Sequence, residues 1–228
     1  MKKIVLSLLT IITFIACEKK DGAEGANVHI TGNVEGLGQG KLYIQKIQDS
    51  ALVILDSIII KGDSKFESNI KLESPEMLYL FLDRGQTNSI DNNLMFFAEP
   101  GNIKIETTLK EFFAGAKISG SKSHDLWVEF NKINRRFNED NLTLIEKRLK
   151  NELKPNQATS DSIETAYQNL LKRKYRYTAN FAVNHSDNSI APYLALSEIA
   201  NININSIFIQ SYDINTGENL KEPYIQLG

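Results

Sequence analysis

Cysteine is almost absent from this sequence of 228 residues, because Cys17 is its only cysteine. The chain downstream of Cys17 has no thiol, which excludes a disulfide, a thiol nucleophile and a dithiol redox pair from that part. The three histidines, His29, His124 and His185, lie far apart in the sequence, and none belongs to a metal-ligand motif. We therefore expect neither a metal site nor a cofactor.

An excess of charge and a hydrophobic run long enough to span a membrane are also missing. The sequence carries 26 basic and 28 acidic residues, and this balance gives no indication of nucleic-acid binding. The apolar run at residues 4–16 has only 13 residues, whereas a membrane-spanning helix needs about 20. With 42% hydrophobic and 24% charged residues, the chain is typical of a globular protein with one large or two small domains.

The N-terminus has the features of a secretion signal. Lys2 and Lys3 precede the apolar run, and a positive flank before a short hydrophobic core is typical of a signal peptide. A buried core helix is the alternative interpretation, which the position at the extreme N-terminus disfavours. Directly before Cys17 stands the small residue Ala16, and the bulky Phe14 lies three positions before it.

These residues resemble the lipobox of bacterial lipoproteins, although Phe14 stands where leucine is more usual. The resemblance implies a signal peptide over residues 1–16, cleavage after Ala16, and a diacylglycerol on the thiol of Cys17. Two acyl chains suffice for stable membrane attachment, so membrane lipid is the expected partner at Cys17. No transmembrane helix is then required.

Residues 17–26 are expected to be the lipidated cysteine and a flexible tether, because residues 18–25 are charged, contain glycine and lack apolar periodicity. In lipoproteins of the Bacteroidetes group, a similar charged segment can act as a surface-export signal. An ordinary tether that ends in the periplasm is the other interpretation. The expected location is the bacterial cell envelope, anchored by lipid to the outer membrane, on its periplasmic face or at the cell surface.

Residues 27–120 show the alternation of a β domain. Val28, Ile30 and Val34 alternate with polar neighbours, residues 36–40 contain three glycines that interrupt the pattern, and further short apolar runs follow at regular spacing. About eight strands fit this region. Strands of this length without helical patterns between them favour an antiparallel β-sandwich.

Several features inside this β domain have a structural and a functional interpretation. The G-x-G-x-G pattern at residues 36–40 joins two strands rather than opening a helix, so it predicts a hairpin loop and not a phosphate site. Residues 58–60 are apolar on both faces and predict a central strand. The polar segment 83–93 is either a contact surface or simply a loop. Glu99 has no second catalytic group beside it in the sequence, so we interpret it as part of a turn.

The period changes to that of helices in residues 121–205. Apolar residues recur on one helix face up to Pro155, first as Leu126, Phe130, Ile133 and Phe137, then as Leu142, Ile145, Leu149 and Leu153. Asp161 and Glu164 form a capping-box-like start for a long helix over about residues 162–183. The fold class predicted is therefore a β-rich N-terminal antiparallel sandwich followed by an α-helical region, α+β overall.

The last part of the chain is less regular. A further helix is predicted over residues 190–200, with Pro192 in its first turn. Beyond it, Ile202, Ile204, Ile207 and Ile209 alternate as a strand would. Residues 206–228 are therefore an ambiguous C-terminal tail.

Two aromatic features of the helical region could bind a ligand. The run at residues 172–177 interleaves basic and aromatic side chains, but on a helix these point all round the axis, which favours a solvated face over a single patch. Trp127 is the only tryptophan. We interpret it as a core residue where the two regions meet, with a sugar-stacking platform as the alternative.

Several short motifs occur in the same order as in one known protein family. They are residues 30–34 (ITGNV), 41–44 (KLYI), 55–57 (LDS), 65–66 (KF), 96–101 (FFAEPG), 118–121 (ISGS) and 188–193 (NSIAPY). They resemble the uncharacterised β domain and helical linker that precede the thioredoxin-like domain in lipid-anchored disulfide reductases of Bacteroidetes. The resemblance covers about residues 27–200. The W-C-x-x-C site of those reductases has no counterpart here, so no catalytic residue is carried over.

The function expected from the sequence is that of a non-catalytic binding or accessory module in the envelope, with lipidation at Cys17 as its one predicted site. An envelope protein or a glycan is the expected class of partner, with no nucleic acid. The alternative is the front portion of a thioredoxin-like thiol-disulfide oxidoreductase. A surface binder of glycans or nutrients is a third interpretation, based on Trp127, the tyrosines and the tether.

Overall fold

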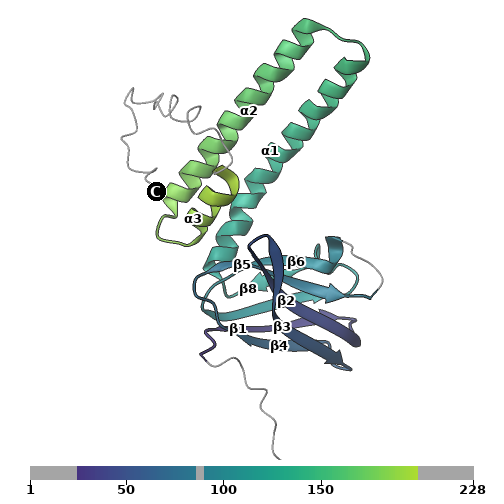
Figure 1. Cartoon of the computed structure of the whole chain (residues 1–228), viewed down its shortest axis with the longest axis vertical. Helices are drawn as coiled ribbons and strands as arrows, with labels where there is room; N and C mark the ends of the chain where they lie inside the picture. Colours follow the sequence, from purple (N-terminus) through teal and green to yellow (C-terminus); the bar gives the residue numbers. More distant parts are fainter. Residues whose placement is uncertain (1–24, 86–89, 200–228) are drawn as a thin grey trace, which may run out of the picture.

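The computed structural model describes residues 25–85 and 90–199. Two four-stranded sheets pack face to face, and two long helices follow as a hairpin that extends away from the sandwich (Figure 1). The eight strands are β1 (Val28–Glu35), β2 (Gln39–Gln48), β3 (Ala51–Lys61), β4 (Lys65–Ile70), β5 (Glu76–Asp83), β6 (Asn93–Ala98), β7 (Gly101–Thr108) and β8 (Lys117–Ser119). The predicted α+β fold class is confirmed.

The strand order is β4-β1-β7-β8 in one sheet and β3-β2-β5-β6 in the other. Neighbouring strands are antiparallel, except that β1 and β7 run parallel, with Val28 opposite Gly101 and Glu35 opposite Thr108. Alternation along a strand reveals which residues face the core but not the direction of the neighbouring strand. The parallel pair could therefore not be predicted from the sequence.

The core of the sandwich is filled by alternate residues of the strands. Val28, Ile30 and Val34 of β1 are buried, as the alternation predicts. Gly32 stands at the position in this series where a side chain would also point inward. A Cβ atom there would lie 2.5 Å from the ring of Phe66, so the missing side chain leaves room for that ring.

The prediction of a central strand at residues 58–60 is wrong, because β3 lies at the edge of its sheet. Ile58 and Ile60 are buried in the core, whereas Ile59 points outward and is 55% exposed. An apolar run on both faces indicated full burial. In the structure no described element covers the outer side of Ile59.

The first helix, α1 (Lys122–Leu153), begins where the Ser121 side chain accepts a hydrogen bond from the backbone N–H of His124 at 3.0 Å. It ends before Pro155, as predicted. The second helix, α2 (Gln157–Asn184), begins earlier than the predicted residue 162. The Asn156 side chain accepts from the N–H of Thr159 at 3.0 Å and caps the helix, so the capping-box-like residues lie inside it.

The two apolar quartets of α1 do not share one face. Leu126 and Phe130 are buried, and Ile133 and Phe137 are partly buried. The second quartet is exposed: Leu142 by 60%, Ile145 by 42%, Leu149 by 56% and Leu153 by 83%. The five-residue step from Phe137 to Leu142 rotates the helix face by about 140°. The second quartet therefore turns away from the side that packs on α2.

The chain then folds back along α2. Helix α3 (Ile190–Leu194) contains Pro192 and is followed by a π-helical turn, η2 (Ala195–Ile199). The predicted helix over residues 190–200 is thus α-helical only in its first five residues. In η2, Glu198 pairs with Lys174 of α2 at 2.9 Å, and both side chains are about three-quarters buried. No helix within the described residues is long and apolar enough to cross a membrane.

Candidate functional site

The base of the hairpin packs on the outer face of the second sheet and forms a junction cluster. Its buried members are Met77, Phe97, Leu126, Phe130, Phe181, Ile190 and Leu194. Strand β6 is buried on both faces, because Phe96 points into the sandwich core and Phe97 points into the junction cluster. Phe97 also meets Tyr193 of α3 edge to face, with ring centroids 5.3 Å apart. The cluster therefore fixes the hairpin to the sandwich.

A carboxylate from the sandwich holds the start of α1. Glu99 Oε1 accepts a hydrogen bond from the N–H of Lys122 at 2.5 Å, and its Oε2 accepts from the Ser123 hydroxyl at 2.5 Å. Negative charge at a helix N-terminus is stabilising, because unpaired N–H groups and the helix dipole converge there. From the sequence, Glu99 is expected only to form part of a turn, and this role is not predicted. No local pattern joins residues that lie more than 20 positions apart.

His124 lies buried at the same junction. Its Nδ1 accepts a hydrogen bond from the backbone N–H of Phe97 at 3.3 Å, and its ring centroid is 5.6 Å from that of Trp127. Burial lowers the pKa of His124 below its ordinary value, and the nearby Asp125 carboxylate offsets this only in part. The neutral imidazole is therefore the form that fits the junction.

The stability of the fold is expected to depend on the charge of His124. Because its pKa is lower in the folded state than the ordinary 6.5, the unfolded chain binds more protons between these two values. Neutral His124 therefore makes its full contribution to the free energy of unfolding above about pH 6.5. This contribution is lost as the pH falls toward the pKa of the folded state. Urea unfolding from pH 7.5 to 5 should show the loss, and His124→Asn, which keeps an acceptor but cannot titrate, should show less of it. Parallel curves for the two proteins would contradict this role.

Trp127 is partly buried against the junction cluster, so the interpretation as a core residue between the two regions is confirmed.

The basic and aromatic run over residues 172–177 is divided among different partners. Arg173 pairs with Asp140 at 3.4 Å, Lys174 pairs with Glu198, and the Tyr177 hydroxyl donates to the Phe130 carbonyl at 3.1 Å. Gly36 and Gly38 lie between β1 and β2, and Gly40 lies in β2. The predicted hairpin is wrong, because β1 and β2 belong to different sheets and do not pair, so this segment connects the two sheets.

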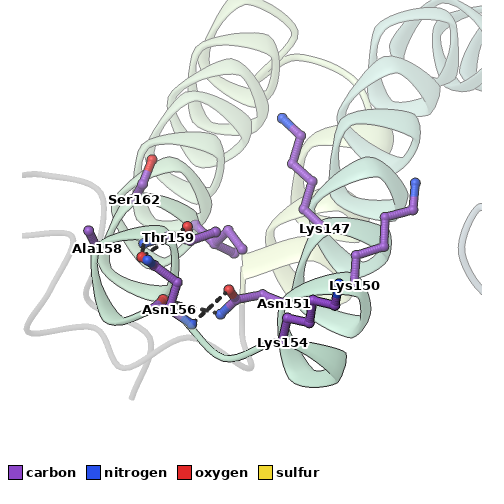
Figure 2. Close-up of a pocket in the computed structure, with 9 residues that line it drawn as sticks. Lys147, Lys150, Asn151, Lys154, Asn156, Ala158, Thr159 and Ser162 are labelled. Carbon is purple, nitrogen blue, oxygen red and sulfur yellow. Dashed lines mark hydrogen bonds between the residues drawn. The ribbon is translucent and has the colours of Figure 1, made fainter.

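An open cleft of about 610 Å³ lies at the far end of the hairpin, between the end of α1 and the start of α2 (Figure 2). It is lined by Lys147, Lys150, Asn151, Lys154, Asn156, Ala158, Thr159, Ser162 and Ile163. Asn151 orders the turn between the helices, because its Nδ2 donates to the Ser160 hydroxyl at 2.8 Å and its Oδ1 accepts from the N–H of Asn156 at 3.2 Å. No motif in the sequence predicts this group of residues.

Hydrogen-bond donors dominate the lining of the cleft. Its lysine, amide and hydroxyl groups offer mainly hydrogen-bond donors, and the nine lining residues include no carboxylate or histidine for acid–base catalysis. Within residues 25–85 and 90–199, no three His, Cys, Asp or Glu side chains gather closely enough to hold a metal ion. Cys17 and residues 206–228 lie outside the described part, as does the middle of the loop at 83–93, so those predictions stay open.

The fold and junction define an α+β protein in which a β-sandwich carries a helical hairpin. Residues 28–127 match a family model described as "Domain of unknown function (DUF4369)". The match spans all eight strands and ends inside α1, so the sandwich region is similar to an uncharacterised domain family.

Other comparisons add little to this family match. None of the curated proteins matches the chain. Among solved structures, a transthyretin from Sparus aurata is similar at 12% identity with a TM-score of 0.29, over 42% of this chain and 99% of that one. A similarity at this TM-score carries no argument about fold or function.

Proposed function

We propose that the protein is a lipid-anchored lipoprotein of the bacterial cell envelope and acts as a non-catalytic binding or accessory module. Its anchor is Cys17, and its recognition element is the helical hairpin. The N-terminal signal pattern and the lipobox-like residues before Cys17 support the anchor. The relationship to the N-terminal domain of lipid-anchored thioredoxin-like reductases belongs to the same proposal and is supported by the order of the shared motifs.

The observation that carries the binding role is the length of the hairpin beyond its junction with the sandwich. Helix α1 has 32 residues and is about 48 Å long at 1.5 Å per residue. Its buried residues all lie between Ser123 and Asn134, in the part of the helix nearest the sandwich. The outer part of α1 contributes nothing to the junction cluster. Figure 1 shows this part of the hairpin extending away from the sandwich. Its exposed side chains are polar, basic and apolar, as on a contact surface for a partner.

Photo-crosslinking in cells that produce the full chain tests this role. Benzoylphenylalanine in place of Lys150 puts the probe in the cleft, and the same probe in place of Glu67, exposed on β4, is the matched control. The cleft position is expected to give a discrete adduct with an envelope component that the control position does not give. Equal labelling from both positions, or none from the cleft, would refute the role of the hairpin.

A further inference from the structure

Helix α1 has an exposed apolar face without a described partner. It consists of Leu142, Ile145, Leu149 and Leu153, and we call it the apolar stripe. Its members follow at i, i+3, i+7 and i+11, so they lie along one side of the helix. Four neighbouring large apolar side chains form a contiguous patch, and such patches mark contact surfaces. The stripe is distinct from the cleft. Ile145 and Leu149 are each two positions from Lys147, which is about 200° around the helix.

The apolar stripe lies on the side of the hairpin where η2 runs back along α2. Arg148, three positions from Ile145 and its neighbour on the helix surface, ion-pairs with Glu164 of α2 at 3.6 Å, and its guanidinium lies 5.8 Å from the Tyr167 ring centroid. Tyr167 and Lys174 are seven positions apart and share one side of α2. Lys174 is the residue to which η2 attaches through Glu198. Helix α1 thus presents its stripe beside the path of η2.

Along the axis of the hairpin, the end of η2 also lies close to the start of the apolar stripe. Lys174 follows Arg173, which pairs with Asp140 of α1, so Glu198 lies level with residue 140. The stripe begins two residues further along α1, at Leu142. From there to Leu153 it is about 17 Å long. Ile199, the last described residue, therefore lies near the lower end of the stripe and on its side, and 29 residues of the sequence follow it.

We propose that the segment after Ile199 of the same chain covers the apolar stripe, with residues 202–209 as the contact. In an extended segment, Ile202, Ile204 and Phe208 share one side, because side chains at every second position point the same way. Eight residues in extended form reach about 23 Å, enough to follow the whole stripe. The two segments also carry opposite net charges, which favours their contact. Residues 200–228 have three acidic residues and one basic, whereas residues 121–186 have 12 basic and eight acidic.

Intramolecular photo-crosslinking of the full chain tests this proposal. Benzoylphenylalanine replaces Phe208 in the protein extracted from membranes in mild detergent, and mass spectrometry identifies the linked peptide. The expected product is a crosslink within one chain to the peptide that contains residues 142–153. Leu149→Glu should lower its yield by about tenfold or more, because the carboxylate would lose water against apolar side chains. The matched control Thr143→Glu adds the same charge at an exposed position about 160° around the helix from Ile145 and should leave the yield unchanged.

Every other product counts against the proposal. A crosslinked dimer would show that a second copy of the chain covers the stripe. An adduct with lipid, detergent or another protein, or no product at all, would show that residues 202–209 lie elsewhere. Leu149 is more than half exposed, so its replacement is not expected to unfold the helix, and an unchanged circular dichroism spectrum of Leu149→Glu checks this.

Discussion

Gly120→Ala is expected to destabilise the protein by about 3 kcal/mol or more, through backbone strain and a steric clash. Gly120 lies between β8 and α1 and has a φ of +92°, a conformation that other residues rarely adopt. A Cβ atom there would lie 2.0 Å from the carbonyl oxygen of Asn102 on β7. This oxygen belongs to the backbone of a paired strand, so it cannot move without disturbing the sheet. Urea unfolding measures the loss.

Gly38→Ala is the matched control for this substitution. Gly38 lies in the loop between β1 and β2, and a Cβ atom there would meet no atom within 4 Å. The change in stability is therefore expected to stay within about 0.5 kcal/mol. Equal effects of the two substitutions would show that the close contact of Gly120 with β7 does not exist in solution.

Phe97→Ala is expected to cost about 3–5 kcal/mol and to release the hairpin from the sandwich. The Phe97 ring is fully buried between β6 and the helices, where it contacts Tyr193. Its removal leaves a cavity in the middle of the junction cluster, which the rigid sheet cannot close. Hydrogen exchange should become faster in the first turns of α1 and in α3, while the strands of the other sheet stay protected.

Phe113→Ala is the control, because Phe113 is 41% exposed and belongs to neither buried cluster. Its removal is expected to cost less than about 1 kcal/mol. If Phe97→Ala were as mild, or if all strands lost protection together with the helices, the junction would not be a separate cluster that holds the hairpin.

The strands and helices could largely be predicted from local patterns. The alternation of Val28, Ile30 and Val34 located β1, and Pro155 located the end of α1. Such patterns work because the side-chain period of a strand or helix is set by the backbone within a few residues. The start of α2 was placed too late because Asn156 was not recognised as its cap.

Contacts between distant residues could not be predicted. The apolar residues Leu142 to Leu153 have the spacing of a buried helix face, yet spacing does not show whether another element covers that face. The hydrogen bonds of Glu99 to the start of α1 and the parallel pairing of β1 with β7 depend on tertiary structure. The cleft at the end of the hairpin depends on it too, because its lysines gain their neighbours only when α2 turns back.

The intact mass of the protein extracted from native membranes tests lipid anchoring most directly. The predicted result is the mass of a chain that begins at Cys17 and carries a lipid adduct, which would support an anchored module of the envelope. A chain that retains residues 1–16, or that begins elsewhere without lipid, would contradict the anchor. A species larger by a thioredoxin-sized domain would instead favour the front portion of a disulfide reductase.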